Sequence, residues 1–238
     1  MNLVVDAGNS FTKLALFSSG ELIRMAVLAC DEVKGQLKSW MDEYEVKSCI
    51  VSSVRESDSS LKEDLGNFFP IHFLSAQTKV PIIINYENPD SLGSDRIANA
   101  VACEKEFTGK SCLVVDCGTC ITYTTVSRHT LTGGAISPGI DMRFKSLEHY
   151  TGKLPLVERT ESFALLGTST ESSIRSGVLI GIINEVRGMI EEFSSITDDL
   201  HVIITGGDLL LFEQHIKSRI FARPNFTLYG LNEILEIQ

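Results

Sequence analysis

The sequence predicts an α/β fold made of two similar halves, each with a mixed β-sheet flanked by helices. The first observation is an internal repeat: VVDAGNSFTK at residues 4–13 returns as VVDCGTCITY at residues 114–123. The second is that two β-rich runs joined by a short polar turn follow each copy, which is typical of a hairpin. The third is that helix and strand patterns alternate afterwards, which indicates helices on the faces of a sheet. A repeat of this kind constrains the architecture of the whole chain.

The repeat places the same residue types at matching positions in the two halves. Aspartate, glycine and threonine coincide in the alignment: Asp6 with Asp116, Gly8 with Gly118 and Thr12 with Thr122. A polar stretch at residues 108–110 lies between the copies and divides the chain almost in half. We therefore predict an N-terminal lobe at residues 1–109 and a C-terminal lobe at residues 110–238.

Strand and helix patterns appear in a similar order in both halves. Runs rich in β-branched and aromatic residues predict strands at residues 11–17, 22–28, 48–54, 121–126, 131–136 and 201–205. Apolar residues at helical spacing predict helices at residues 31–44, 57–68, 94–107, 170–193 and 208–217. The longest irregular stretch, residues 75–92, contains two prolines and is a candidate for a functional loop.

The composition is that of an ordinary globular protein. Hydrophobic residues make up 43% of the 238 residues and charged residues 22%, an apolar content that argues against disorder. The formal net charge of -10 disfavours nucleic acid and anionic membranes as partners, although a local site can still bind a small anion. No apolar run approaches the ~20 residues of a membrane span, and the amino terminus does not resemble a signal peptide. These features predict a cytoplasmic protein with reduced cysteines.

Cys117 and Cys120 form a CxxC pair within the second copy of the repeat. Such a pair occurs in redox and zinc sites, but no second CxxC or CxxH lies nearby to complete a tetrahedral zinc site. We therefore interpret the two cysteines as small side chains in a tight turn.

The first copy of the repeat has the composition of a phosphate-binding turn. A buried strand is expected to end at Asp6, and Gly8 lets the backbone turn sharply and approach a ligand. Hydroxyl and amide donors, together with the charge of Lys13, suit phosphate oxygens. Asp6 is itself anionic, so it would hold a cation that bridges to phosphate. Alone, the pattern fits a β-turn with a solvated lysine equally well.

Three further segments strengthen the phosphate interpretation. The second copy repeats the acid, the glycine and the hydroxyl without the lysine, which favours two carboxylate-bearing turns in one cleft. In VIITGGD, residues 202–208, a strand leads to two glycines that could let adenine or ribose lie on the backbone, or could simply form a tight turn. In GGAISPG, residues 133–139, a strand end turns into a helix whose N-terminus could face phosphate.

Together these motifs resemble those of the superfamily of acetate and sugar kinases, actin and chaperone ATPases. Within it they are most similar to type III pantothenate kinases. The family patterns DxGNTxxK, GADR, DxGTAxT, GGxIxPG, TxxLP, GxNTxxxxxSG and TGGD correspond to residues 6–13, 93–96, 116–122, 133–139, 151–155, 167–177 and 205–208. The chain departs from these patterns at Ser10, Ser94, Cys120, Ile121 and Ser169. The resemblance covers essentially the whole chain and implies a duplicated ribonuclease-H-like, actin-like ATPase fold with a cleft between two mixed sheets.

The resemblance also implies a function: phosphorylation of pantothenate with ATP, which is the first step of coenzyme A biosynthesis. The ATP phosphates would be bound by Asp6, Ala7, Gly8, Asn9, Ser10, Phe11, Thr12, Lys13 and Thr119. Pantothenate would be contacted by Tyr86, Gly93, Ser94, Asp95, Arg96 and Thr170, with Asp95 as the general base. Asp116 would help to bind a monovalent cation, K+ or NH4+, and Mg2+ would accompany ATP. A homodimer is typical of the family, and the partner subunit would complete the substrate pocket.

Local sequence alone leaves Asp95 and Arg96 open to simpler interpretations. Asp95 lies where a long loop enters a helix, and aspartate is a common N-cap there. Arg96 fits either a solvated first-turn charge or a bidentate clamp for a carboxylate such as that of pantothenate. The family resemblance favours the base and the clamp.

Two other functions remain as alternatives. A sugar kinase of the same superfamily is one, although the zinc motif of such kinases is missing from the sequence. A nucleotide-binding regulator or filament-forming protein without kinase activity is the other, and Asp95 within its motif argues against it.

Overall fold

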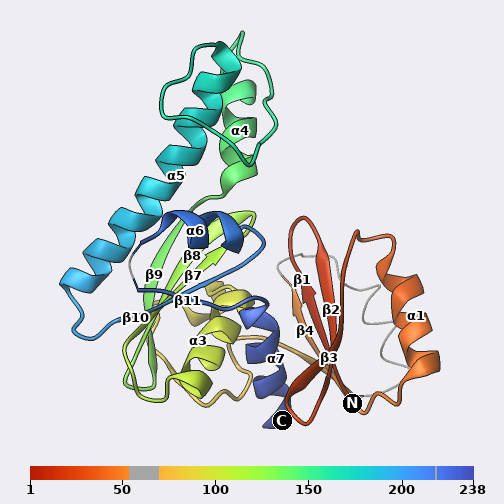
Figure 1. Ribbon diagram of the computed structural model, residues 1–238. Helices are drawn as coiled ribbons and strands as arrows, with labels where there is room; N and C mark the ends of the chain where they lie inside the picture. Colours follow the sequence, from red (N-terminus) through yellow and green to blue (C-terminus); the bar gives the residue numbers. More distant parts are fainter. Residues whose placement is uncertain (54–69, 218) are drawn as a thin grey trace. The chain divides into compact units, whose positions relative to one another are not determined.

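The computed structural model describes three stretches of the chain, residues 1–53, 70–217 and 219–238 (Figure 1). These residues form two compact units: unit 1 comprises residues 1–110, 126–133 and 225–238, and unit 2 comprises residues 111–125 and 134–224. Among the helices of the described stretches, none is both long enough and apolar enough to cross a membrane.

Unit 1 contains a mixed five-stranded sheet with the order β3-β2-β1-β4-β5. Its strands are β1 (Asn2–Ala7), β2 (Thr12–Ser18), β3 (Glu21–Leu28), β4 (Ser48–Ser53) and β5 (Ile71–Phe73). The first three strands form an antiparallel meander, whereas β4 and β5 run parallel to β1. The sheet therefore begins with local hairpins and is completed by strands that return from further along the chain.

Helices cover this sheet in unit 1: α1 (Val33–Glu43) on one face and α7 (Phe226–Glu236) on the other (Figure 1). The core on the α1 side is apolar: Leu3, Val5, Leu14, Leu16, Val33, Leu37 and Trp40. On the α7 side the ring of Phe17 meets that of Tyr229 edge to face, with their centroids 5.3 Å apart.

A third helix, α3 (Ser94–Glu106), packs closely against α7 in unit 1. A side chain at Gly230 would collide with the backbone of Ala98, so glycine permits the close approach of the two helices. Thr227 Oγ1 donates to Asn99 Oδ1 at 2.9 Å in the same buried contact. Two short elements, β6 (Ile83–Ile84) and the 3-10 helix η1 (Pro89–Ser91), precede α3.

Unit 2 repeats the strand order of unit 1. Its strands are β7 (Cys112–Cys117), β8 (Cys120–Ser127), β9 (Thr130–Pro138), β10 (His201–Thr205) and β11 (Phe221–Ala222), except that residues 126–133, the end of β8 and the start of β9, belong to unit 1. They are ordered β11-β10-β7-β8-β9, and β10 runs parallel to both of its neighbours. In unit 1, β6 pairs with the start of β9, at residues 130 and 131. Each sheet thus has a three-stranded meander followed by two parallel strands, which confirms the predicted α/β fold with two mixed sheets flanked by helices.

The helices of unit 2 are α4 (Ile140–His149), α5 (Thr170–Ser195) and α6 (Leu209–His215). Figure 1 shows α4 beside the N-terminal part of α5, and the two helices are in contact. The apolar stripe of α5 packs on the sheet through Val178, Ile182, Val186 and Ile190. The N-cap of α5 is Ser169, which forms a capping box with Ser172.

Most predicted elements agree with the observed ones to within a few residues. The helix predicted at residues 57–68 lies outside the described residues. The short strands β5, β6 and β11 and the helix α7 were not predicted, whereas α4 begins directly after the GGAISPG segment, where the start of a helix was expected. Nearly every turn of α7 is buried, so no apolar stripe marks it as a helix. The division after residue 109 and the cleft between the halves stay predictions.

Candidate active site

The first copy of the repeat forms a hairpin turn between β1 and β2 in unit 1. Asp6 and Lys13 are register partners on these strands, so their side chains are neighbours on one face of the sheet. The amide of Gly8 donates to the carbonyl of Phe11 at 3.1 Å and closes the turn. Of the residues predicted to bind ATP phosphates, Asn9, Ser10 and Phe11 are exposed, whereas Ala7 and Thr12 are buried. The turn can therefore offer its tip and Lys13 to a ligand, but not the side chain of Thr12.

The predicted base lies at the start of α3, in the same unit. Gly93 is the N-cap and Asp95 is the second residue of the helix, so the N-cap interpretation of Asp95 is wrong. A Cβ atom at Gly93 would collide with the carboxylate of Asp95, which therefore folds back over the glycine. A glycine at this position leaves room for the carboxylate.

A buried hydrogen bond connects the start of α3 to the strand beside the phosphate turn. Ser52 of β4 is the parallel register partner of Asp6. Its Oγ lies 2.8 Å from Oγ of Ser94, the residue before Asp95. Unit 1 thus brings the Asp6 turn and the predicted base to neighbouring positions at one edge of the sheet.

A cavity of about 510 Å³ lies beside the start of α3 in unit 1. Gly93 and Ser94 line it, together with Ser53 at the end of β4. The opposite loop is fixed by Gln77, whose Nε2 donates to Asp90 Oδ1 at 2.6 Å. This volume is within the usual range of small-molecule sites.

Tyr86 and Arg96, both predicted to contact the substrate, contact each other. The guanidinium carbon of Arg96 lies 5.5 Å from the centroid of the Tyr86 ring, and Nη1 is 3.4 Å from its hydroxyl. Arg96 is 4% exposed, so the interpretation of this residue as a solvated surface charge is wrong. The aromatic ring holds the guanidinium in one orientation.

The second copy of the repeat forms a tighter turn between β7 and β8 in unit 2. The amide of Gly118 donates to the carbonyl of Cys120 at 3.0 Å. The amide of Gly139, the N-cap of α4, donates to the carbonyl of Thr119 at 3.1 Å. Gly139 has no room for a side chain, because a Cβ atom would collide with the backbone of Gly118 and Thr119. The GGAISPG segment therefore packs directly on this turn.

The TGGD segment packs on the same turn from the end of β10. The amide of Asp208 donates to the carbonyl of Cys117 at 3.0 Å. Gly206 has φ +96°, and a Cβ atom there would collide with Cys117 and the carboxylate of Asp116. Packing against the turn thus explains Gly206, whereas no atom lies within 4 Å of the position of a Cβ atom at Gly207. Three motifs that are far apart in sequence meet at one end of the unit 2 sheet.

Asp208 adds an ion pair that sequence reasoning missed. Its Oδ1 accepts a hydrogen bond from Nη1 of Arg159, which lies in the loop between α4 and α5. Burial raises the pKa of the Asp208 carboxyl, Arg159 opposes this shift, and the charge of Asp141 adds to it. No local pattern marks Arg159, because it lies in an irregular loop.

Asp116 was predicted to help bind a monovalent cation. Within the described residues, no group of three or more His, Cys, Asp or Glu side chains is placed to hold a metal ion. Asp116 offers carboxylate oxygens at the end of β7, and hard cations such as K+ and Mg2+ prefer oxygen ligands. The role of Asp116 in binding a cation stays a prediction.

Thr170, the remaining predicted substrate contact, is the first residue of α5. It lines a cavity of about 1010 Å³ in unit 2, together with Ser169, Arg143 and Ser146. Ser169, which departs from the family pattern, caps the helix by accepting from the Ser172 amide at 3.2 Å. The serine thus keeps the side-chain oxygen that an asparagine would use as a cap.

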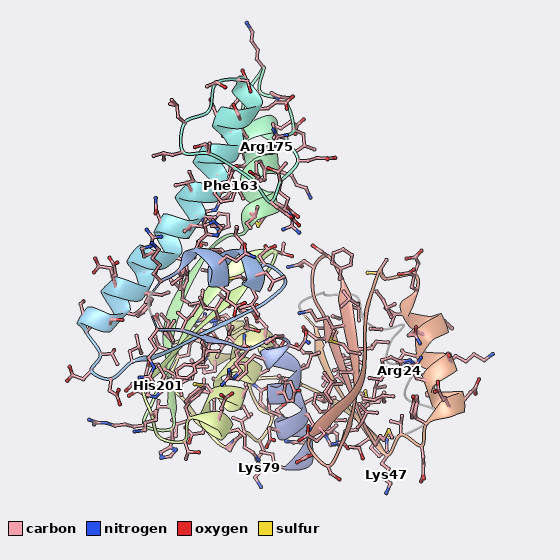
Figure 2. The ribbon with its side chains drawn as sticks, viewed as in Figure 1. Arg24, Lys47, Lys79, Phe163, Arg175 and His201 are labelled. Atoms are coloured by element: carbon pink, nitrogen blue, oxygen red, sulfur yellow. The ribbon has the colours of Figure 1, made fainter. Side chains whose placement is uncertain are left out.

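The loop that precedes Thr170 is anchored to unit 2 at several points. Nε of Arg175 donates to the carbonyl of Glu158 at 3.0 Å, and Ser176 Oγ donates to that of Leu165 at 2.6 Å. The ring of Phe163 stacks on that of His215 with centroids 5.4 Å apart. Figure 2 shows Phe163 and Arg175 at this end of unit 2. The loop is thus held by side chains on α5 and α6.

Cys117 and Cys120 are free thiols. Cys117 is buried, and burial raises the pKa of its thiol. The sulfur of Cys120 lies 3.8 Å from that of Met142. This geometry agrees with the interpretation of the pair as small side chains in a tight turn.

Comparison with known proteins identifies the family. The model of the type III pantothenate kinase family matches residues 2–192. A type III pantothenate kinase from Christiangramia forsetii is 40% identical over 238 residues, which cover 99% of this chain and 98% of the relative. One from Cytophaga hutchinsonii is 40% identical over 236 residues, with coverage of 99% and 98%.

Solved structures agree on the fold. A Campylobacter jejuni protein described as a Baf family transcriptional activator superposes with a TM-score of 0.66 at 22% identity, covering 99% of this chain and 98% of that one. A ROK hexokinase from Thermus thermophilus superposes with a TM-score of 0.51 at 11% identity, covering 99% of both chains. These two likenesses show the fold alone. The family model covers residues 2–192, and both relatives cover 99% of this chain. The chain therefore belongs to the type III pantothenate kinase family.

Proposed function

We propose that this protein transfers the γ-phosphoryl group of ATP to the primary hydroxyl of pantothenate. The product is 4'-phosphopantothenate, and the reaction is the first step of coenzyme A biosynthesis. The observation that carries the proposal is the hydrogen bond between Ser52 and Ser94, which links the strand beside Asp6 to the residue before Asp95. A phosphate turn and an acceptor base must be neighbours for direct phosphoryl transfer.

Asp95 is the general base of the proposed mechanism. Its carboxylate accepts the proton of the pantothenate hydroxyl as the oxygen attacks the γ-phosphorus, the bond from that phosphorus to the β,γ-bridging oxygen breaks, and ADP leaves. A positioned base of this kind contributes ~10²–10⁴-fold to the rate. The fold of the carboxylate back over Gly93 supports a fixed position for the base.

The two repeat turns divide the work of binding ATP in this proposal. Lys13, the amides of the first turn and the side chains of Asn9 and Ser10 donate to phosphate oxygens. Thr119 contributes from the second turn, and Asp116 holds a monovalent cation, K+ or NH4+. Bound Mg2+ and the monovalent cation would neutralise charge on the phosphates.

The acceptor is held by the remaining predicted contacts. Arg96 pairs with the pantothenate carboxylate, and its fixed orientation against Tyr86 supports a bidentate contact. Gly93, Ser94 and Thr170 complete the pocket in the proposal.

A homodimer in the cytoplasm is the proposed form of the enzyme. Leu165 and Leu166, in the loop before the cavity that Thr170 lines, are 79% and 80% exposed, and such side chains are favourable to bury against a second copy. Light scattering coupled to size exclusion would give twice the chain mass, and a monomer under assay conditions would contradict this part.

A coupled assay of ADP release tests the function. We expect turnover with ATP and pantothenate. The rate should depend on Mg2+ and should increase with K+ or NH4+. Asp95→Asn is expected to lower kcat by ~10²–10⁴-fold while ATP binding, measured by calorimetry, survives.

The same assay separates the alternative functions. Turnover only with members of a sugar panel would favour the sugar-kinase alternative, and nucleotide binding without turnover of any acceptor would favour a regulator. Wild-type activity in Asp95→Asn would remove this residue from its role.

A further inference from the structure

The end of β9 is tied to α4 and α5 by a polar network that has no role in the mechanism above. The hydroxyl of Ser137 donates to Oε1 of Glu185 at 2.6 Å. Nη2 of Arg143 donates to Oε2 of the same carboxylate at 2.7 Å, and its Nε donates to the carbonyl of Pro138 at 2.8 Å. Glu185 on α5 therefore reaches the end of β9 twice, directly through Ser137 and indirectly through the arginine of α4.

The segment held by Glu185 is in turn hydrogen-bonded to the second repeat turn. Gly139 follows Pro138 and donates its amide to the carbonyl of Thr119 at 3.1 Å. The backbone of Thr119 is so close that a Cβ atom at Gly139 would collide with it. No space is left between Gly139 and Thr119, so a shift of Pro138 and Gly139 toward the turn would move Thr119 as well.

The geometry of the network fixes an orientation. Arg143 and Glu185 are 21% and 31% exposed, so the pair is partly buried and its loss would also cost some stability. The planar guanidinium uses two of its nitrogens for two different acceptors, a geometry that lysine does not reproduce. Each carboxylate oxygen of Glu185 accepts one donor, so the side chain has a single favoured position.

We propose that Glu185 is a positioning residue, which fixes the Pro138–Gly139 segment and through it the place of Thr119 in the ATP site. The inference rests on the proposed function for its kinetic test, since Thr119 is a proposed ATP contact. Arg143 and Ser137 are the two arms through which Glu185 acts.

The test compares Glu185→Ala and Glu185→Gln with the wild-type enzyme in steady-state kinetics. Glu185→Ala is expected to lower kcat/KM for ATP by about ten- to a hundred-fold, because misplacement of a binding group by about 1 Å has effects of this size. The KM for ATP should rise by more than the KM for pantothenate, which the change affects only through Arg143 in the cavity that Thr170 lines. Glu185→Gln should recover most of the loss, because its amide can accept from Arg143 and donate to Ser137.

A matched control is available in unit 1. Glu43 accepts from Arg24 at the same distance of 2.7 Å, and Figure 2 shows Arg24 beside α1. This pair is exposed and contacts no proposed ligand, so Glu43→Ala should leave both KM values unchanged.

Several outcomes would overturn the inference. A purely structural role would lower the melting temperature and scale kcat with the folded fraction while leaving the KM for ATP at its wild-type value. If Glu185→Ala does not fold, Glu185→Gln and Ser137→Ala carry the test, and wild-type KM values for ATP in a folded Ser137→Ala variant would sink the proposal. If the wild-type protein shows no pantothenate-dependent turnover, the proposed function fails separately. Calorimetric ATP titration of the Glu185 variants then decides the inference, and unchanged affinity would refute it.

Discussion

The two copies of the repeat have nearly the same sequence pattern but form different turns. In unit 1, the amide of Gly8 closes on the carbonyl of Phe11, so Asn9, Ser10 and Phe11 are exposed at the tip. In unit 2, the corresponding bond from Gly118 reaches only to Cys120, and β8 begins two residues earlier in the repeat than β2 does. The first turn is thus open and rich in donors, whereas the second is short.

The residues next to the two turns also differ, and they leave the first turn open and pack against the second. Asp6 and Asp116 have equivalent register partners, Ser52 and Thr205, on the adjacent parallel strands. The next residue is Ser53 in unit 1 but Gly206 in unit 2, where the backbone packs against the turn. The duplicated halves therefore carry two carboxylates at equivalent places. The first turn exposes hydrogen-bond donors, whereas the second is held by backbone packing.

The largest expected effect comes from making the second turn resemble the first. Gly206→Ser introduces the residue type of unit 1 at a position with φ +96° whose Cβ atom would collide with Cys117 and Asp116. Strain and collision together should lower the free energy of unfolding by ~2–4 kcal/mol, as measured by urea denaturation. Gly207→Ser is the control, because no atom lies within 4 Å of its Cβ position, and its stability should stay near that of wild type. Equal losses in the two variants would show that packing on the turn is not the reason for Gly206.

A smaller effect is expected from the charge that only the first turn carries. Lys13→Met should raise the KM for ATP and lower kcat/KM by ~10–100-fold, since a charge-assisted hydrogen bond contributes about 1.5–3 kcal/mol. Lys38 is an exposed lysine on α1 of the same unit, so Lys38→Met removes an equal charge away from the turn and should leave ATP kinetics unchanged. Similar losses in both variants would mean that the position of Lys13 in the turn does not matter.

The smallest expected effect concerns pH and the carboxylate of Asp208, which follows Gly206 and Gly207 in the TGGD segment. Burial raises its pKa in the folded protein, so the folded state binds more protons than the unfolded state between the ordinary and the raised pKa. Stability from this group therefore falls as pH rises through that window. As pH rises through this acidic range, the free energy of unfolding of wild type should fall relative to that of Asp208→Asn. Denaturant titrations at several pH values would measure the difference. A relative gain for wild type would show that the ion pair with Arg159 outweighs burial.

Much of the fold could be predicted because strong local signals coincide with it. Alternating and apolar runs gave β2, β3, β8, β9 and β10 to within a few residues. Apart from β6, which is added beside β9, the strand order is the same in both sheets. The elements that were missed are either two to three residues long or lack a polar face. Such elements depend on pairing and burial supplied by distant parts of the chain rather than on their own pattern.

The candidate site was predictable as a set of residue types but not as a set of contacts. Asp6 and Asp116 stood out because an acid beside a glycine turn has a recognisable spacing, whereas the role predicted for Asp95 came only from the family resemblance. Arg159 and Glu185 did not stand out, because their partners lie 49 and 42–48 residues away. No local pattern records pairing over such separations.

The sequence by itself determined the duplication, the α/β class and the family, because these depend on short motifs and periodicities that survive without any knowledge of contacts. Only the tertiary structure decided that Gly206 and Gly139 pack on the second turn, that Arg96 is buried against Tyr86, and that Asp95 is not a helix cap. The physical reason is that burial, close approach and pairing are properties of residues brought together by folding. The same aspartate-glycine motif can therefore form an open turn in one unit and a tightly packed one in the other.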